Sequence, residues 1–229
     1  MGNHQYMSSV KRIVCLANSW KMKERCIAGI DIDTGKWVRP VCDNQYPADG
    51  RVPKYVRLIA NREPQLLDIL EIPLADTGKD FGFECENLSV LPSRWRCLGK
   101  ARATDLLSYC QQFPQILHNS LKYVNPSYLK NLQFHQRRTL QLIHVVSFFV
   151  EKKTNYKGNP EWRGTLQTAN YQHLRYAKIT DPVFVEKLEA GYQPPNNCLV
   201  TVSLSIPWAP PNWEGEDPCW KLIAGVIDI

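Results

Sequence analysis

Short runs of apolar residues separated by turn residues dominate the first forty positions of the chain. The apolar runs at 13–17 and 26–32 have the length and composition of buried strands. Asp33-Thr34-Gly35 then favours a tight reversal into 37–41, because glycine accepts a positive φ and aspartate bonds its own backbone. The pattern predicts a three-stranded antiparallel meander.

The pattern changes at Thr104, a good helix N-cap, after which three proline-separated pieces show helical spacing. A strand pattern returns at Arg137 and continues to the end of the chain. Each half contains a strand followed by an Ile-Pro pair, at 72–73 and 206–207, which hints at a duplication.

We therefore predict a mainly β fold with a helical connector (β/α+β). The predicted parts are a disordered leader at 1–10, a first barrel at 11–103, a helical connector at 104–136 and a second barrel at 137–229. Five or so strands and one helix per half is the inventory of a small Greek-key barrel, so both are expected to be tandem OB-like five-stranded barrels.

Several segments, taken in order, resemble a known family. They are IVCLANSWKM, RCIAGIDIDTGKWVRPV, LLDILEIPL, YAKITDP, CLVTVSLSIPW and WKLIAGVIDI, and together they span residues 13–229. They resemble the prokaryotic proteins built on a dual OB-containing domain. The resemblance implies two OB-like barrels in tandem, and it brings no active-site motif with it.

The charge is unevenly distributed along the chain, whose formal net charge is +6. Residues 10–62 carry eleven Lys or Arg against five Asp or Glu, whereas residues 181–229 carry two against seven. A basic half is compatible with a polyanionic partner, and equally with attraction between the two halves of the chain.

The motifs of common enzymes and metal sites are missing from the sequence. Eight cysteines occur without any CxxC pair and without histidines at zinc-ligand spacing, and no phosphate-binding loop or nucleophile elbow is present. We expect reduced thiols, no metal and no cofactor, although a catalytic set of residues far apart in sequence would leave no local mark.

The sequence also bears on location. No run of about 18 apolar residues and no secretory signal is found, which predicts a cytoplasmic protein without a membrane span. A reducing compartment agrees with the expectation of free thiols.

The remaining signal is a set of aromatic and basic residues, because OB barrels bind single strands by stacking bases on aromatics while cations follow the backbone. In the first half the candidates are Trp20, Lys21, Lys23, Arg25, Trp37, Arg39 and Arg51. In the second half they are Tyr156, Lys157, Trp162, Arg163, Tyr171, His173, Arg175 and Tyr176.

The sequence thus predicts a non-catalytic protein that binds single-stranded DNA or RNA. Two alternatives stay open: a regulatory module that senses a nucleotide or a modified base, and a module that docks a partner protein. The aromatic candidates could instead fill small barrels and the cations could be solvated, and for Trp37 a place in the core is at least as compatible with the pattern.

Overall fold

The computed structural model describes residues 8–110 and 113–229. The chain divides into two compact units, residues 1–101 (unit 1) and 102–229 (unit 2). Of the predicted leader at 1–10, residues 1–7 lie outside the described part, and residues 8–10 already belong to the first strand. Each unit is described by itself.

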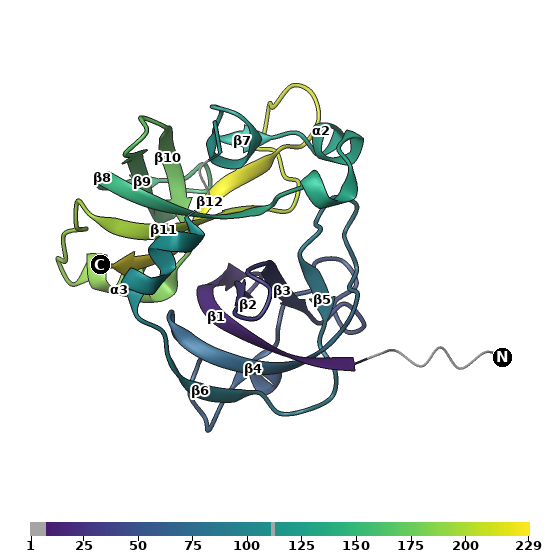
Figure 1. Cartoon of the computed structure of the whole chain (residues 1–229). Helices are drawn as coiled ribbons and strands as arrows, with labels where there is room; N and C mark the ends of the chain where they lie inside the picture. Colours follow the sequence, from purple (N-terminus) through teal and green to yellow (C-terminus); the bar gives the residue numbers. More distant parts are fainter. Residues whose placement is uncertain (1–7, 111–112) are drawn as a thin grey trace. The chain divides into compact units, whose positions relative to one another are not determined.

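Unit 1 contains the predicted meander, extended by further strands (Figure 1). Its elements are β1 (Ser8–Lys21), β2 (Glu24–Asp31), β3 (Trp37–Val41), α1 (Lys54–Arg57), β4 (Asp68–Ala75), β5 (Asn87–Ser89) and β6 (Arg96–Lys100). The reversal between β2 and β3 has Gly35 at a φ of 67°, as its sequence predicts. The meander is therefore confirmed.

The strands of unit 1 form a curled half-barrel in the order β5-β3-β2-β1-β4-β6. β3 and β5 are parallel, and Leu74 of β4 forms an isolated bridge with Val90, the residue after β5. The buried core comprises side chains from the strands and from the loops that follow them: Ile13, Cys15, Ile27, Val38, Val52, Leu70, Ile72, Leu74 and Trp95.

Two local predictions for unit 1 are wrong. The sequence predicts a short strand at 55–60, and a second strand that leaves the sheet at Pro73. The first of these segments instead overlaps the helical turn α1. The second forms β4, which continues to Ala75. It can do so because β6 pairs only with Asp68–Glu71 of β4. Proline has no backbone N–H, but Pro73 lies beyond these paired residues, so the β4–β6 ladder loses no hydrogen bond.

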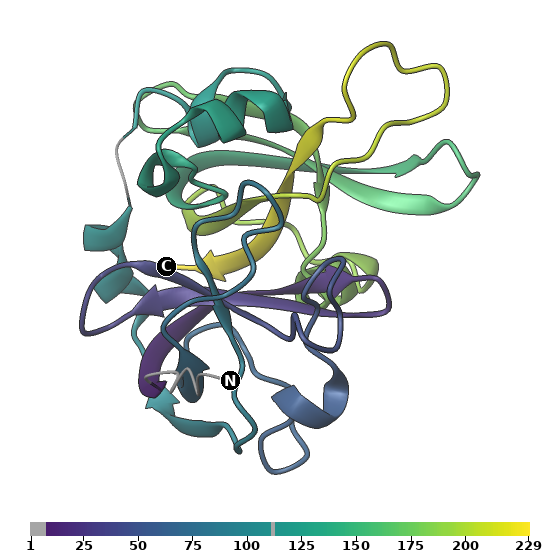
Figure 2. The ribbon, with the colours of Figure 1, turned by 90° about the vertical axis from the view of Figure 1, so that its right-hand side faces the viewer.

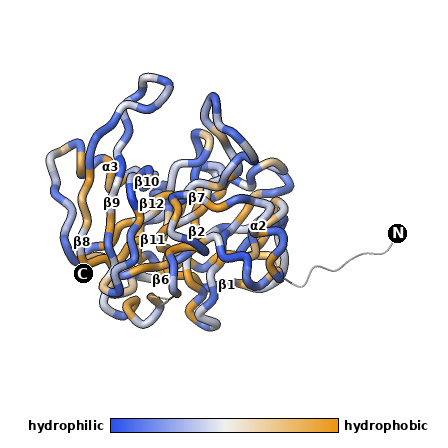
Figure 3. The backbone as a smooth tube through the Cα atoms, turned by 90° about the horizontal axis from the view of Figure 1, so that it is seen from above, coloured by the Kyte–Doolittle hydropathy of each residue, from blue (hydrophilic) through white to orange (hydrophobic). Residues whose placement is uncertain are grey.

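Unit 2 contains a closed five-stranded barrel. The five are β8 (Leu140–Thr154), β9 (Pro160–Thr168), β10 (His173–Ile179), β11 (Cys198–Leu204) and β12 (Cys219–Asp228), and the short β7 (Tyr123–Val124) pairs with β12 outside the ring. The order is β10-β9-β8-β11-β12, and a parallel pairing of β10 with β12 closes the ring. Figure 3 shows hydrophobic residues along β11 and β12, whereas long loops are hydrophilic.

The two units share one connectivity. In each, the first strand pairs with the second and the fourth, and the third is parallel to the fifth. A helix follows the third strand in both: α1 in unit 1 and α3 (Pro182–Glu189) in unit 2. This is the order of an OB-like barrel, and it confirms the predicted fold class and the openings of the two barrels at β1 and β8.

In the sequence, Asp181 followed by Pro182, with Gly191 further on, predicts a capped helix between them, and the structure has α3 there. Asp181 is the N-cap, and its Oδ1 accepts hydrogen bonds from the backbone N–H groups of Val183 and Phe184. Its Oδ2 accepts from the N–H of Val226 in β12 at 3.2 Å. Burial raises the pKa of Asp181, while these three donors oppose the rise. One carboxylate thus anchors the helix to the barrel.

The predicted helical connector has a different structure and belongs to unit 2. It consists of short pieces: η1 (Ala103–Tyr109), η2 (Ile116–His118), β7, α2 (Pro126–Asn131) and η3 (Phe134–Gln136). Of the predicted first helical piece, residues 111–112 lie outside the described part of the chain. In the second predicted piece, after Pro114, a long helix does not form because Leu117 and His118 have positive φ values.

A buried lysine holds this irregular segment in place. The Nζ of Lys221 in β12 donates to the carbonyl oxygens of Ile116 (2.5 Å) and Asn119 (2.6 Å), and to Oδ1 of Asn119 (3.0 Å). Burial lowers the pKa of Lys221 to about 7, while the three oxygens favour the ammonium form. The segment is therefore fixed by a residue about a hundred positions away in sequence.

Candidate nucleic-acid interface

The accessible part of the first hairpin of unit 1 is its turn end. Residues 13–19 of β1 and 27–31 of β2 are buried on both faces. Lys21 pairs with Glu24, so Met22 and Lys23 form a two-residue turn, with φ values of 48° and 68°. Both are in the left-handed region, which costs a non-glycine residue about 1–2 kcal/mol. The turn thus presents Lys23 to solvent on a strained backbone.

Two loops, one after β3 and one after β4, meet this turn and bring cations onto aromatic rings. Lys21 and Lys79 lie over the ring of Phe81, with Nζ to centroid distances of 5.9 and 5.7 Å. Arg51 lies over the ring of Tyr46 at 4.6 Å, and it donates to the carbonyl oxygen of Met22 at 2.8 Å. We call this set the basic loop cluster: Lys21, Lys23, Tyr46, Arg51, Lys79 and Phe81.

The predicted residues Trp20 and Arg25 form a separate pair on the hairpin. They are opposite each other in the β1–β2 ladder, and the guanidinium carbon of Arg25 is 3.7 Å from the centroid of the Trp20 ring. Because side chains alternate along a strand, this pair faces away from the neighbouring Lys21. Trp20 is 53% exposed, so it is not a core residue.

Two further candidates in unit 1 do not reach the surface cluster. Arg39 is 2% exposed and pairs with the equally buried Glu84, with its Nη1 3.0 Å from Oε2. Burial alone would lower the pKa of Arg39, but Glu84 and Glu86 raise it. Arg39 was expected to contact a ligand; instead it is part of the interior. Trp37 on β3 is partly buried, and we do not place it in the cluster.

In unit 2 the predicted residues are distributed over several surfaces. Trp162 donates its indole N–H to Glu189 of α3 at 2.7 Å, so it packs on that helix. Arg163 pairs with Glu161 and also donates to the carbonyl oxygen of Tyr176. Tyr171 is 79% exposed in the β9–β10 turn, and the exposed Arg175 follows on β10.

An exposed aromatic face lies on the second barrel, where β8, β9 and β10 are adjacent. Phe149 of β8 is opposite Thr165 of β9, and the hydroxyl of Thr165 accepts from the backbone N–H of Tyr176 in β10. Phe149 is 63% exposed and Tyr176 53%. The next position on β9 that faces the same way is Arg163, opposite Lys178. We call these residues the outer strand face: Phe149, Arg163, Tyr176 and Lys178.

Phe149 was not predicted as a site residue from the sequence. The signal was present, because one of two adjacent phenylalanines in one strand must point outward. Lys79, Phe81 and Tyr46 were not predicted either, because no local pattern exists for them. Only folding brings these loop residues to the turn at Met22.

Another group of aromatic side chains packs on itself at the loop between β11 and β12. The rings of Tyr156 and Trp208 stack with centroids 5.4 Å apart, and Trp220 makes edge contacts with Trp213 and Tyr123. Figure 2 shows this loop and the β8–β9 hairpin, which carries Tyr156, extending from unit 2. The loop also carries acidic residues at 214, 216 and 217, which repel a polyanion. The ring contacts of this group therefore explain how the loop is held in place, and we do not assign ligand binding to it.

The chemistry of the thiols does not favour nucleophilic catalysis. All eight cysteines lie within the described residues as thiols, and burial raises the pKa values of Cys42 and Cys110 to about 11 and those of Cys85 and Cys198 to about 12. The thiolate is the nucleophilic form, so these four are weak nucleophiles at neutral pH. Among the described residues, no group of three or more His, Cys, Asp or Glu has the arrangement of a metal site.

Within residues 8–110 and 113–229, none of the helices has both the length and the apolar character needed to cross a bilayer.

Comparison with known proteins gives one match. The family model of the dual OB-containing domain matches residues 11–226, which is nearly the whole chain. No curated protein and no solved structure matches it.

Proposed function

Because the chain belongs to the dual OB-containing domain family, we propose that it is a binding protein for single-stranded nucleic acid, without a reaction of its own. The family supports a binding module built on OB folds. In such barrels the face of the second and third strands, together with the loops after the first and the fourth strand, contacts oligonucleotides.

The basic loop cluster is the observation that carries the proposal. Lys21 ends the first strand of unit 1 and Lys23 lies in the turn that follows it, while Lys79 and Phe81 belong to the loop after the fourth strand. These are the two loops that contact ligands in OB folds. A group of cations at this place suits a single strand, because the cations neutralise phosphates. The rings beneath them, Tyr46 and Phe81, are half-buried.

The outer strand face of unit 2 supports the proposal independently. It lies on the strands equivalent to the first three of an OB barrel, and it exposes Phe149 and Tyr176 next to Arg163 and Lys178. Glu161 pairs with both cations at 2.6 and 3.1 Å, which reduces their net attraction for phosphate. We therefore assign stacking to this face and charge neutralisation to unit 1.

The test is the salt dependence of oligonucleotide binding in a charge-removal variant. Each phosphate contact on a single strand contributes about −0.7 to the slope of log K against log salt. The variant K21A/K23A should bind more weakly and lose about 1.4 from that slope. The control K36A/K54A removes the same charge from exposed positions of unit 1 outside the cluster and should retain the slope.

Stacking is tested separately from charge. The variant F149A should lose about 1–3 kcal/mol of binding free energy with the slope unchanged, because an exposed ring of the outer strand face contributes stacking and no charge. If K21A/K23A and its control bind a single strand with equal affinity and slope, the proposal fails. The docking of a partner protein then becomes the better account of the exposed surfaces.

A further inference from the structure

Unit 1 contains a cavity of about 1040 Å³ that the proposed polynucleotide surface does not explain. Its wall comes from four segments far apart in sequence: 42–45 after β3, 55–61 with α1, 75–79 after β4 and 89–95 after β5. The volume is at the upper end of small-molecule sites, which measure about 300–1,000 Å³.

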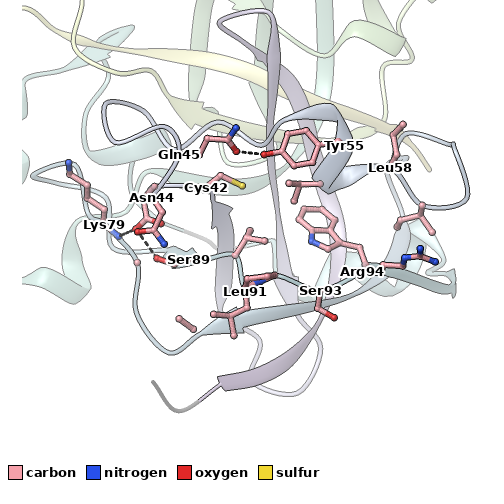
Figure 4. A pocket seen from close by; sticks show the side chains of 18 of the residues that line it. Cys42, Asn44, Gln45, Tyr55, Leu58, Lys79, Ser89, Leu91, Ser93 and Arg94 are labelled. Carbon is pink, nitrogen blue, oxygen red and sulfur yellow. Dashed lines mark hydrogen bonds between the residues drawn. The ribbon is translucent and has the colours of Figure 1, made fainter. Parts of the chain in front are cut away.

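The cavity is polar at its ends and apolar between them. Figure 4 shows Asn44, Lys79 and Ser89 gathered at one side and Arg94 at the other, while Gln45 and Tyr55 are hydrogen-bonded on the rim. The apolar part of the wall includes Val56, Leu58, Ile59, Val90, Leu91 and Trp95. The arrangement suits a ligand with a flat apolar body and polar groups at its edge.

Trp95 supplies the second observation. Its side chain is 4% exposed and lines the cavity, and within the described residues its indole Nε1–H has no hydrogen-bond partner. A buried donor without a partner costs about 1–3 kcal/mol. Protein atoms enclose this N–H in the present conformation. A ligand whose acceptor meets it after a small shift of the ring would remove that cost, whereas a purely apolar ligand would leave it in place.

We propose that this cavity binds a mononucleotide. The base would pack against the apolar wall with an acceptor of its ring at Trp95, and the side-chain amides of Asn44 and Gln45 can both donate to and accept from its edge. The guanidinium of the exposed Arg94 would meet the phosphate, which it can bind through two parallel hydrogen bonds. This site shares Lys79 with the basic loop cluster and is otherwise lined by different residues, and the inference does not rest on polynucleotide binding.

The experiment measures binding of AMP, GMP, CMP and UMP to the full chain by calorimetry and by thermal stabilisation. We expect saturable binding of at least one of them, since a ligand that binds the folded state raises the melting temperature. In W95F, which keeps a ring but removes the N–H, its affinity should fall by about 5- to 150-fold. The matched control is W37F, because the indole N–H of Trp37 is also buried without a partner among the described residues, outside the cavity wall.

A second variant keeps the test decisive if W95F is poorly folded. R94A removes an exposed side chain, so it should fold, and it should bind the monophosphate no better than the corresponding nucleoside. The proposal is overturned if none of the four monophosphates binds at about 1 mM. It is also overturned if a folded W95F binds as tightly as W37F, or if R94A keeps the wild-type preference for the phosphate.

Discussion

The strained turn between β1 and β2 provides a sharp test of how this surface is built. We consider the replacement of Met22-Lys23 by Asn-Gly, the pair that two-residue turns with two positive φ values prefer. The Met22 side chain is 58% exposed, so little packing is lost. The bond from Arg51 is made to the backbone carbonyl of Met22 and survives the change.

The expected stabilisation follows from the two φ values of 48° and 68°. Relief of left-handed strain contributes about 2–3 kcal/mol over both positions. The greater freedom of glycine in the unfolded chain offsets about 1 kcal/mol of this. We therefore expect a net gain of about 1–2 kcal/mol in the free energy of unfolding, which for a unit of about 100 residues raises the melting temperature by roughly 4–16 °C.

The assay combines guanidinium unfolding, followed by tryptophan fluorescence, with oligonucleotide binding at several salt concentrations. The variant also removes the charge of Lys23, so its salt slope should fall by about 0.7. The turn at Ala60-Asn61 is a matched control, since its φ values are 49° and 63° and it bears no cation. Asn-Gly at that turn should stabilise unit 1 without changing the slope. Unchanged or lower stability in both variants would refute the strain argument, and equal slopes would refute the role of Lys23.

Three further predictions follow from buried groups. Arg39→Met should destabilise unit 1 by about 3–5 kcal/mol in urea unfolding because it leaves the carboxylate of Glu84 buried and unpaired; adding Glu84→Gln should recover part of the loss. Asp181→Ala removes the acceptor of three backbone N–H groups and should cost unit 2 about 2–4 kcal/mol. Burial lowers the pKa of Lys221 from 10.5 to about 7, so between these pH values the unfolded state binds more protons than the folded state. The free energy of unfolding should therefore rise from pH 7 towards pH 10, by up to about 1.4 kcal/mol per pH unit. A pH series on Lys221→Met should lack this rise.

Elements whose cause is local could be predicted from the sequence. The reversal at Asp33-Thr34-Gly35 and the capping of α3 by Asp181 depend on residues within a few positions of each other, and both are confirmed. The long apolar runs of the sequence likewise predicted the positions of β1 and β8. These features require only backbone preferences and hydrophobic periodicity.

Features that depend on distant partners could not be predicted. The segment 116–119 shows helical spacing, but Lys221 fixes it in another conformation. Arg39 alternates with apolar Val38 in its strand, as a surface residue would. It is buried because Glu84, which lies 45 positions later, compensates its charge. The basic loop cluster likewise joins loops that no sequence pattern connects.

The most direct test of single-strand binding is the affinity of the full chain for labelled DNA and RNA single strands of about 20 nucleotides, measured by anisotropy between about 50 and 200 mM salt. We predict saturable binding at low salt, with log K falling linearly against log salt at a slope of about −2 or steeper, which corresponds to three or more phosphate contacts. If neither the DNA nor the RNA single strand binds saturably, or if the slope is near zero, the proposal of single-strand binding is contradicted.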